Sequence, residues 1–282
     1  VNFANAVTTS RAKLPFGIAQ IGKSFRNEIT TGNFLFRSRE FEQMEMEFFV
    51  KPGDTSEWLE YWSNARLDWY KSLGITEEKL KLRSHEDNEL AHYAAACFDV
   101  EYEFPFGWSE LEGIADRGSY DLDQHTQHSG KKLTWFDSKT NEHITPAVVE
   151  TSAGVDRTVL TILVDAYHEE KVKNEQRVVL KLNPKVAPIT LAVFPLVNRD
   201  GMPEIAEKIM DDLKGDFAAF FDAGGSIGRR YRRQDEAGTP YGVTVDSDTL
   251  SDQTVTVRER DSMAQERVSI DQLSSYFRDK LC

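Results

Sequence analysis

The sequence reads FRNE at residues 25–28 and FRSREFEQMEME at residues 36–47, two runs separated by a loop. Read with a period of two, they predict an antiparallel pair of strands joined by that loop. One face of the pair is predicted to be apolar and to meet a core, with Ile21 and Phe25 on the first strand. The opposite face gathers arginines, carboxylates and the Phe41 ring.

The polar face has the chemistry of a nucleotide site. Planar guanidinium groups donate two parallel hydrogen bonds to phosphate oxygens, and an aromatic ring beside them suits a stacked base. Carboxylates on the same sheet suit an ammonium group or a metal ion. The alternative is a solvated sheet with cross-strand Arg–Glu pairs, each of which contributes little to stability. The pattern alone leaves both interpretations open.

Composition restricts the class of protein. A chain of 282 residues, 40% hydrophobic and 29% charged, is long enough for two domains with cores of their own. No apolar run is long enough to span a bilayer and no signal peptide opens the sequence, so we expect a cytoplasmic protein with no membrane contact. The net charge of −13 argues against sequence-independent affinity for nucleic acid, so RNA contacts must use local basic patches.

Candidate metal ligands are few. Cys97 and Cys282 have no spacing typical of a disulfide framework or a zinc site. Cys97, which follows three alanines, is predicted to be a small buried residue. His125 and His128, with aspartates nearby, fit either a metal site or a polar surface loop, and the lack of a second ligand pair favours the loop.

Further periodic segments predict the remaining elements. We expect helices at 56–73, 89–98, 155–167, 203–221, 227–236 and 269–280, and strands at 99–104, 106–113, 144–150, 191–196, 241–245 and 254–258. Residues 131–143 are predicted to form an exposed hairpin, and the polar run at residues 168–177 is interpreted as a linker. The alternation of strand and helix after this run predicts a small α/β domain with a mixed or largely parallel sheet.

Two of these helices carry a more specific expectation. The aromatic stripe of helix 56–73 is predicted to be core rather than a platform for bases. Helix 155–167 places Arg157 in its first turn, and Asp156 with Arg157 alone would fit a helix-capping Asp beside an exposed Arg. The apolar face predicted for this helix consists of Val159, Leu160, Leu163 and Val164.

The polar hairpin resembles motif 2 of the class II aminoacyl-tRNA synthetases. Its longer string, RNEIT at residues 26–30 and REFEQME at residues 39–45, resembles the glycyl-tRNA synthetases of the dimeric bacterial type. Matching segments follow in the same order: GIADRG at 113–118, VETSAGVDR at 149–157 and GRRYRRQDE at 228–236. The step from a strand into GVDR at a helix start resembles motif 3. The resemblance covers essentially the whole chain.

The resemblance implies an α+β protein with an antiparallel-sheet catalytic core and a small α/β anticodon-binding domain. We expect the core at residues 1–170, with an insertion around residues 50–145, a linker at 171–185 and the anticodon-binding domain at 186–282. The family's segment before motif 2, which contains motif 1, is not in this sequence. We therefore expect a fragment of a longer protein that forms a homodimer.

The activity that the resemblance implies uses ATP and Mg²⁺. Glycine and ATP give glycyl-adenylate and pyrophosphate, and glycine then passes to the 3′ end of tRNA(Gly). The expected catalytic residues are Arg26, Glu28 and Arg157. The expected ATP-binding residues are Arg26, Asn27, Glu28, Phe36, Arg37, Ser38, Arg39, Glu40, Phe41, Glu110, Leu111, Gly154, Val155, Asp156 and Arg157. The expected glycine-binding residues are Phe41, Glu42, Gln43, Met44, Glu45, Arg117, Glu150, Thr151, Ser152, Ala153 and Gly154.

Individual roles also follow from the resemblance. Arg26 would contact the α-phosphate, and adenine would stack between Phe41 and Arg157. Glu110 would hold the metal ion. The expected tRNA contacts are Arg229, Arg230, Tyr231, Arg232 and Arg233, for which a solvated helix face is the alternative.

Two other functions remain open from the sequence. One is a different adenylating enzyme of the class II fold, similar to biotin-protein ligases, which would lack the C-terminal anticodon-type domain. The other is a synthetase-like RNA-binding or accessory protein without catalysis, in which loss of Arg26, Glu28 or Arg157 would be expected. All three residues are present.

Overall fold

The computed structural model describes residues 2–86, 88–172 and 174–281, so Cys282 lies outside the described residues. The chain divides into two units, Val1–Thr161 and Ile162–Cys282, called unit 1 and unit 2 below. In the part of the chain that the structure describes, no helix combines the length and the apolar character needed to cross a membrane.

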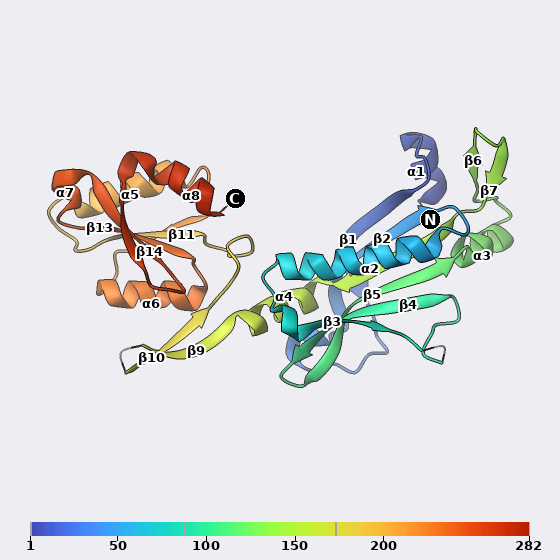
Figure 1. Cartoon of the computed structure of the whole chain (residues 1–282), viewed down its shortest axis with the longest axis horizontal. Coiled ribbons are helices and arrows are strands. Elements are labelled where there is room, and N and C mark those ends of the chain that lie inside the picture. The colour runs from blue at the N-terminus through green and yellow to red at the C-terminus, as the bar shows by residue number, and fades with distance from the viewer. Residues whose placement is uncertain (1, 87, 173, 282) are drawn as a thin grey trace. The chain divides into compact units, whose positions relative to one another are not determined.

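Unit 1 is built on a six-stranded sheet in which every neighbouring pair is antiparallel (Figure 1). Its strands run in the order β1 (Phe16–Phe25), β2 (Glu40–Val50), β8 (Ala147–Gly154), β5 (Gly107–Gly118), β4 (Ala96–Phe104) and β3 (Leu80–Ser84). The hairpin predicted from the period of two is confirmed as β1–β2, and its last pair joins Phe25 to Glu40. The antiparallel core expected for a class II synthetase is therefore present.

The remaining elements of unit 1 surround this sheet. They are α1 (Phe3–Ser10), η1 (Phe34–Phe36), α2 (Thr55–Ser72), η2 (Glu77–Lys79), α3 (Tyr120–Ser129), β6 (Trp135–Asp137) and β7 (Glu142–Ile144). Helix α4 (Val155–Ala166) follows β8 directly. Strands β6 and β7 form the hairpin predicted for residues 131–143.

Helix α2 covers one face of the sheet, against β3, β4, β5 and β8. Its aromatic stripe is core in part: Tyr70 is fully buried and Trp58 packs 4.8 Å from the Phe48 ring, whereas Tyr61 is 55% exposed. Two apolar side chains of β1 are not core, which corrects the prediction: Ile21 and Phe25 are 63% and 66% exposed, whereas Phe16 and Ile18 of the same strand pack against a small core. Strand β1 is an edge of the sheet, beyond the four strands that α2 covers.

The helix predicted at residues 89–98 is wrong, because its last residues belong to β4. Alanine is the best helix former, but helix propensity is a weak determinant, and the pairing of β4 with two neighbouring strands outweighs it. The loop predicted around His125 and His128 is also wrong, since both residues lie on α3. Leu122 on that helix is buried in a small core with Phe3 and Phe49.

Helix α4 packs through a different face from the predicted one. Val159 and Leu163 are 44% and 41% exposed, whereas Thr158 and Thr161 are buried. The two threonine hydroxyls donate to carbonyl oxygens four residues earlier, at 2.9 Å and 2.8 Å. Because this satisfies their polar atoms, threonines can occupy the buried face.

Unit 2 contains a five-stranded mixed sheet (Figure 1). Its strands run in the order β12 (Ala219–Phe221), β11 (Leu191–Pro195), β13 (Tyr241–Val245), β14 (Thr254–Glu259) and β15 (Gln265–Ser269). The first three strands are parallel and the last two pairings are antiparallel. The predicted small α/β domain is confirmed, although β15 was not predicted. The helices are α5 (Met202–Leu213), α6 (Ile227–Ala237), α7 (Thr249–Asp252), η3 (Ile270–Gln272) and α8 (Leu273–Leu281).

Helices cover both faces of this sheet. α5 and α8 share a core with Val193, Val243 and Val257, whereas Tyr231 of α6 packs on the opposite face, against Phe194. Helix α5 is shorter than the predicted helix 203–221, because the chain turns after it and then adds β12 to the sheet edge.

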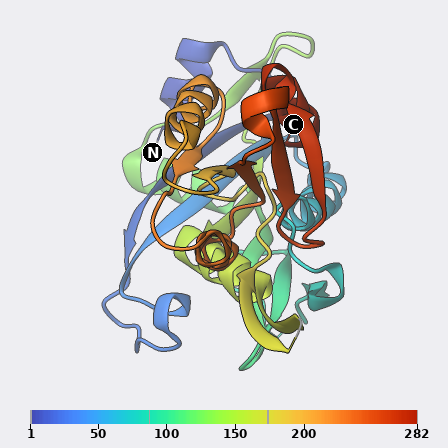
Figure 2. The same cartoon turned by 90° about the vertical axis from the view of Figure 1, so that its left-hand side faces the viewer.

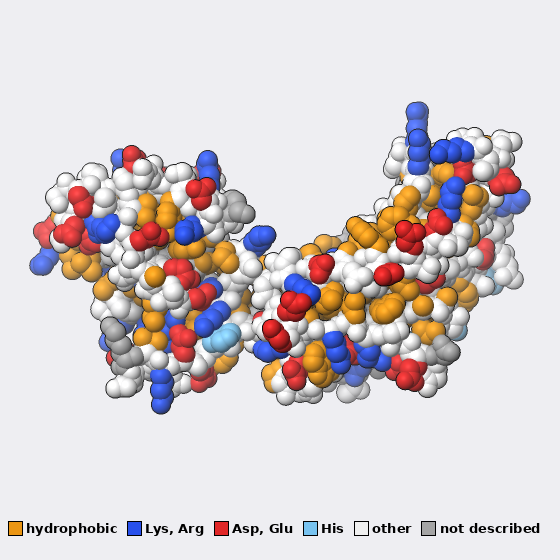
Figure 3. Space-filling model, in the orientation of Figure 1, with side chains coloured by type: hydrophobic (Ala, Val, Ile, Leu, Met, Phe, Trp, Pro, Cys, Tyr) orange, Lys and Arg blue, Asp and Glu red, His pale blue; other side chains and the backbone are white. Residues whose placement is uncertain are grey.

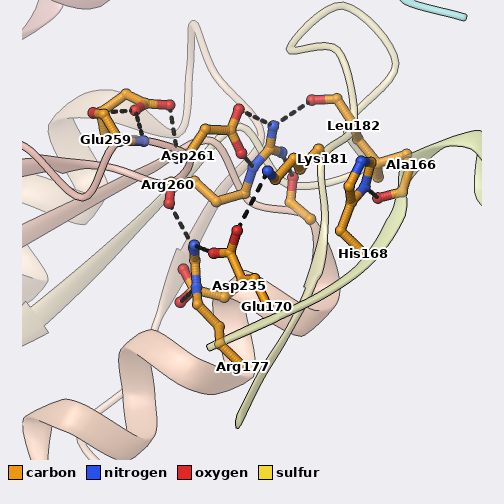
Figure 4. Close-up of polar contacts among 12 residues, drawn as sticks. Ala166, His168, Glu170, Arg177, Lys181, Leu182, Asp235, Glu259, Arg260 and Asp261 are labelled. Atoms are coloured by element: carbon orange, nitrogen blue, oxygen red, sulfur yellow. Dashed lines mark hydrogen bonds and ion pairs between the residues drawn. The ribbon is translucent and has the colours of Figure 1, made fainter. Parts of the chain in front are cut away.

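The polar run interpreted as a linker folds into a hairpin, β9 (Tyr167–Val172) with β10 (Glu175–Leu180). Arg177 on β10 is fully buried and donates from Nε to Asp235 Oδ2 at 2.9 Å. It also donates to Glu170 on β9 and to the carbonyl oxygen of Arg260 (Figure 4). The buried Arg177 guanidinium therefore joins the hairpin to the rest of unit 2. The polar composition of the run did not show that this arginine would be buried rather than solvated.

Candidate active site

A cavity of about 180 Å³ lies in unit 1 between the β1–β2 connection, β5 and the start of α4. The connection is drawn in blue at the lower left of Figure 2, where it extends past the ends of both strands. The lining residues are Arg26, Ile29, Leu35, Phe36, Arg37, Ser38, Phe41, Gln43, Glu110, Leu111, Ser152, Ala153, Gly154, Asp156 and Arg157.

Arg157 lies across one wall of this cavity. Its Nη1 donates to the Glu110 carbonyl oxygen at 2.7 Å and its Nε donates to the Phe36 carbonyl oxygen at 3.3 Å. Its guanidinium carbon is 4.2 Å from the centre of the Phe36 ring, so the two planes form a cation–π contact. Burial lowers the pKa of Arg157 and the nearby Glu110 carboxylate opposes this shift, but an arginine stays charged in either case.

Arg26 and Phe41 form another part of the lining. The Arg26 guanidinium carbon is 5.4 Å from the centre of the Phe41 ring. In the structure Arg157 covers Phe36, and Arg26 is the arginine beside Phe41, while the expected stacking of adenine between Phe41 and Arg157 stays a prediction. Both aromatic rings line the cavity with an arginine next to each.

A polar network across three strands includes two residues of the cavity lining, Gln43 and Ser152. Ser24 Oγ donates to Gln43 Oε1 at 2.8 Å, and Gln43 Nε2 donates to Glu45 Oε2 at 2.8 Å. Gln43 Nε2 also contacts Ser152 Oγ, which in turn donates to Glu45 Oε2 at 3.2 Å. The network fixes the Glu45 carboxylate beside a neutral amide and a hydroxyl rather than beside a cation.

Arg117 holds a second carboxylate near this network. It donates from Nη1 to Glu150 Oε2 at 2.6 Å and forms two bonds with Asp121, at 2.7 Å and 3.0 Å. The Tyr93 ring centre lies 4.0 Å from its guanidinium carbon. Burial raises the pKa of Glu150, while Arg117 opposes the rise. Three groups thus fix the orientation of Arg117.

A second cavity of about 320 Å³ adjoins Glu45 and is lined partly by Glu47, Asp121 and His125. Glu47 continues the alternating polar face of β2, a signal present in the sequence but not used for the site. Burial, reinforced by the Glu150 charge, raises the pKa of Glu47 to about 7.

We expect Glu47→Gln to stabilise unit 1 at alkaline pH and not at acidic pH. The pKa of Glu47 is about 7 in the folded protein and lower in the unfolded chain. As pH rises from the unfolded-state pKa to the folded-state pKa, the folded protein therefore loses stability relative to the unfolded chain. The free energy of unfolding should exceed that of the unchanged protein by about 1–2 kcal/mol at pH 8 and match it near pH 5. Urea unfolding at both pH values measures this, and equal stabilisation at both would contradict the assignment.

The structure brings together ten of the predicted ATP-binding residues in the first cavity: Arg26, Phe36, Arg37, Ser38, Phe41, Glu110, Leu111, Gly154, Asp156 and Arg157. Five others lie outside its lining: Asn27, Glu28, Arg39, Glu40 and Val155. Arg39 instead donates from Nε to the Ile29 carbonyl oxygen at 3.0 Å, which stabilises the β1–β2 connection.

The predicted glycine-binding residues divide between the cavity and its surroundings. Five line the cavity: Phe41, Gln43, Ser152, Ala153 and Gly154. The other six are Glu42, Met44, Glu45, Arg117, Glu150 and Thr151. Of these, Glu45 belongs to the polar network and Glu150 to the Arg117 cluster. The sequence did not identify Ile29, Leu35, Tyr93 or Asp121, because their roles depend on contacts between distant segments.

The basic run of α6 is only partly available to a ligand. Arg230 is 2% exposed and donates to the carbonyl oxygens of Pro195 and Gly225, which corrects its expected role in RNA contact. Arg233 pairs with Asp222. Arg229, Tyr231 and Arg232 line a cavity of about 830 Å³ in unit 2. On the face drawn in Figure 3, acidic and basic side chains are interspersed, as expected for a chain of net negative charge.

Known proteins resemble this chain over its whole length. The family model "tRNA synthetase class II core domain (G, H, P, S and T)" matches residues 2–167, and "Anticodon binding domain" matches residues 190–280. Glycine–tRNA ligase from Caldanaerobacter subterraneus is 56% identical over 281 residues, which cover 100% of this chain and 60% of that protein. The Thermobifida fusca glycine–tRNA ligase is 53% identical over 289 residues, covering 100% and 63%.

The chain therefore spans about three fifths of the length of these relatives. A crystal structure of prolyl-tRNA synthetase from Cryptosporidium parvum matches with a TM-score of 0.73 at 18% identity. That match covers 95% of this chain and 56% of the other, and at such low identity it establishes the shared fold alone.

Proposed function

This chain belongs to the class II tRNA synthetases, and from that premise we propose that it carries the catalytic and anticodon-binding parts of a glycine–tRNA ligase. The protein activates glycine with ATP and transfers glycine to the 3′ end of tRNA(Gly). The observation that carries the proposal is one cavity with two Arg–aromatic pairs beside a carboxylate network. A cytoplasmic homodimer and domain limits at 1–170, 171–185 and 186–282 belong to the same proposal.

The ATP half of the site uses charge and stacking rather than a protein nucleophile. Arg26 holds the α-phosphate and the glycine carboxylate, which brings the attacking oxygen in line with the phosphorus atom. Arg37 contacts the β- and γ-phosphates, which become the pyrophosphate leaving group, and stabilises their negative charge. Adenine stacks on Phe41 or Phe36, each of which has an arginine beside it. Fixed guanidinium groups stabilise the pentavalent transition state more than the ground state.

Magnesium accompanies ATP in the proposal. The Glu110 side chain fits an oxygen-preferring cation because it lines the cavity and is 52% exposed. When bound, the ion neutralises charge on the phosphates.

Glycine offers only an ammonium group and a carboxylate for recognition. Glu45, held by Gln43 and Ser152, accepts hydrogen bonds from the ammonium group, with Glu150 as the second acceptor. An added methyl group in an open pocket would gain only about 1–3 kcal/mol. So small a difference in binding energy cannot exclude alanine. The site must therefore reject alanine because no space beside Ser152 accepts its methyl group.

Amino-acid-dependent ATP–pyrophosphate exchange tests the proposal. The purified protein is assayed with each of the protein amino acids in turn. Exchange with glycine alone is the expected result. Exchange with a different amino acid would overturn the glycine pocket, and binding of tRNA without any exchange would favour the non-catalytic RNA-binding alternative.

We expect Glu45→Gln to raise the KM for glycine by about 10–100-fold and the KM for ATP by less than about threefold. An amide keeps the shape but loses the charge that an ammonium group needs, and a charged hydrogen bond contributes about 1.5–3 kcal/mol. Exchange kinetics with each substrate varied separately measure this. Glu60→Gln, at an exposed position of α2, is the matched control. Equal effects on both KM values would move Glu45 out of the amino-acid pocket.

We also propose that α6 contacts tRNA through its exposed arginines. Arg229→Ala should weaken tRNA binding a few-fold and reduce the slope of log K against log salt by about one, because one phosphate contact is lost. Filter binding over a range of salt concentrations measures both. The control is Arg199→Ala, whose side chain is 76% exposed elsewhere in unit 2. An unchanged salt slope in Arg229→Ala would place the RNA on another surface.

A further inference from the structure

Three metal-ligating side chains meet where β3 ends beside β4. The His85 amide donates to the Cys97 carbonyl oxygen at 3.0 Å, which extends the β3–β4 pairing one residue past Ser84. His85 thus lies opposite Cys97, and Asp99 is two residues further along β4. Because side chains two apart on a strand share a face, all three project from the same side of the sheet.

Their ligand atoms are close enough to share one ion. One nitrogen of His85, the Cys97 sulfur and one oxygen of Asp99 all lie within 4.8 Å of one another. His85 Nε2 is 2.7 Å from Asp99 Oδ2. Around a tetrahedral zinc ion, neighbouring ligand atoms are separated by about 3.3–3.7 Å. Movements of about 1 Å would therefore convert the cluster into three ligands of one site.

We propose that His85, Cys97 and Asp99 bind a zinc ion. Thiolate, imidazole and carboxylate together favour zinc over magnesium or calcium, which prefer oxygen ligands alone. Three protein ligands leave a fourth position for water. Among the residues that the structure describes, this is the one group of three His, Cys, Asp or Glu side chains with such spacing.

The surroundings orient the Asp99 ligand. Arg83 on β3 donates to Asp99 Oδ2 at 3.3 Å and is itself held by Glu101 at 2.9 Å and by Glu89. Asp99 is buried, and His85 is half-buried. A partner that fixes a ligating carboxylate is typical of metal sites. The competing interpretation is a His–Asp hydrogen bond that needs no ion, and it makes no use of Cys97.

Binding has two consequences within unit 1. The ion would join the end of β3 to β4, which pairs with β5, the strand that supplies Glu110 and Leu111 to the cavity. Cys97 must also lose its thiol proton to become a ligand, because the thiolate is the form that binds zinc.

Titration of the chelator-treated chain with Co²⁺ tests the proposal, because cobalt reports thiolate ligation through a sulfur-to-metal charge-transfer band. We expect that band to saturate at one equivalent per chain and to disappear when Zn²⁺ is added. Cys97→Ser should abolish the band and weaken Zn²⁺ binding at least about 100-fold. Asp99→Asn and His85→Gln should keep a weaker band and lose at least the affinity that loss of an outer-shell partner costs, about 10–100-fold.

Controls separate ligation from folding. Cys282→Ser removes the other cysteine in the sequence and should leave the band and the affinity unchanged. Circular dichroism of Cys97→Ser in chelator should match the unchanged chain, because serine keeps the size of the side chain. A band that persists in Cys97→Ser, or no band at stoichiometric Co²⁺, would overturn the proposal and leave a hydrogen-bonded cluster.

Discussion

Arg26→Ala should lower the rate of glycine-dependent ATP–pyrophosphate exchange by about 10³-fold, while unit 1 remains folded. Removal of one preorganised donor to a developing negative charge costs about 10²–10³-fold in other enzymes, and the proposed Arg26 contacts both the phosphate and the carboxylate. The side chain is exposed just beyond β1, so its loss should change the free energy of unfolding by less than about 0.5 kcal/mol. Exchange assays and urea unfolding measure the two quantities.

Two variants make this result specific. Arg26→Lys keeps the charge but loses the parallel donors, so it should recover only part of the activity. Arg11→Ala removes another exposed arginine of unit 1 and should leave exchange unchanged. Activity near normal in Arg26→Ala would contradict the phosphate assignment, whereas unfolding of that variant would make it a structural residue.

The period of two along β2 was enough to predict both the hairpin and the polar face that forms the site. It also placed Gln43 and Glu45 on one side, and their side chains are joined by a hydrogen bond. Strand alternation depends only on local backbone geometry, so it is readable from sequence. The same alternation predicted that Ile21 and Phe25 would be buried, and both are exposed. Burial of a strand side chain depends on whether a helix covers that strand, which the strand's own sequence does not show.

Contacts between distant segments account for most of what the sequence did not predict. The contact of Arg157 with Phe36 was not predicted, because it depends on the β1–β2 connection folding back over the start of α4. The basic run of α6 gave no sign that Arg230 would be buried against backbone carbonyls. A buried arginine and a solvated one have the same sequence signal, since partners decide burial. Cys97 was predicted to be buried, whereas it is only partly buried in the structure.

Buried charged groups also stabilise unit 2, and the sequence did not show which of them would be buried. Asp235 on α6 is 1% exposed and accepts from Arg177 Nε at 2.9 Å, both of which are labelled in Figure 4. It also accepts from Arg258 Nη1 at 2.9 Å. Arg232 adds a third contact at 3.3 Å. One carboxylate therefore joins the β9–β10 hairpin, α6 and β14. Its loss leaves two buried guanidinium groups short of a counter-charge, which is far more costly than the loss of a surface pair.

Asp235→Ala should consequently lower the free energy of unfolding of unit 2 by about 3–5 kcal/mol. Urea unfolding, with amide hydrogen exchange on β13 and β14 to locate the change, measures it. Asp211→Ala is the matched control, because that aspartate is 67% exposed and its pair with Lys214 should contribute less than about 1 kcal/mol. A loss below about 1 kcal/mol in Asp235→Ala would mean that water or Glu170 replaces the missing carboxylate. In that case the Arg177–Asp235 contact with α6 would not be needed to hold the β9–β10 hairpin in unit 2.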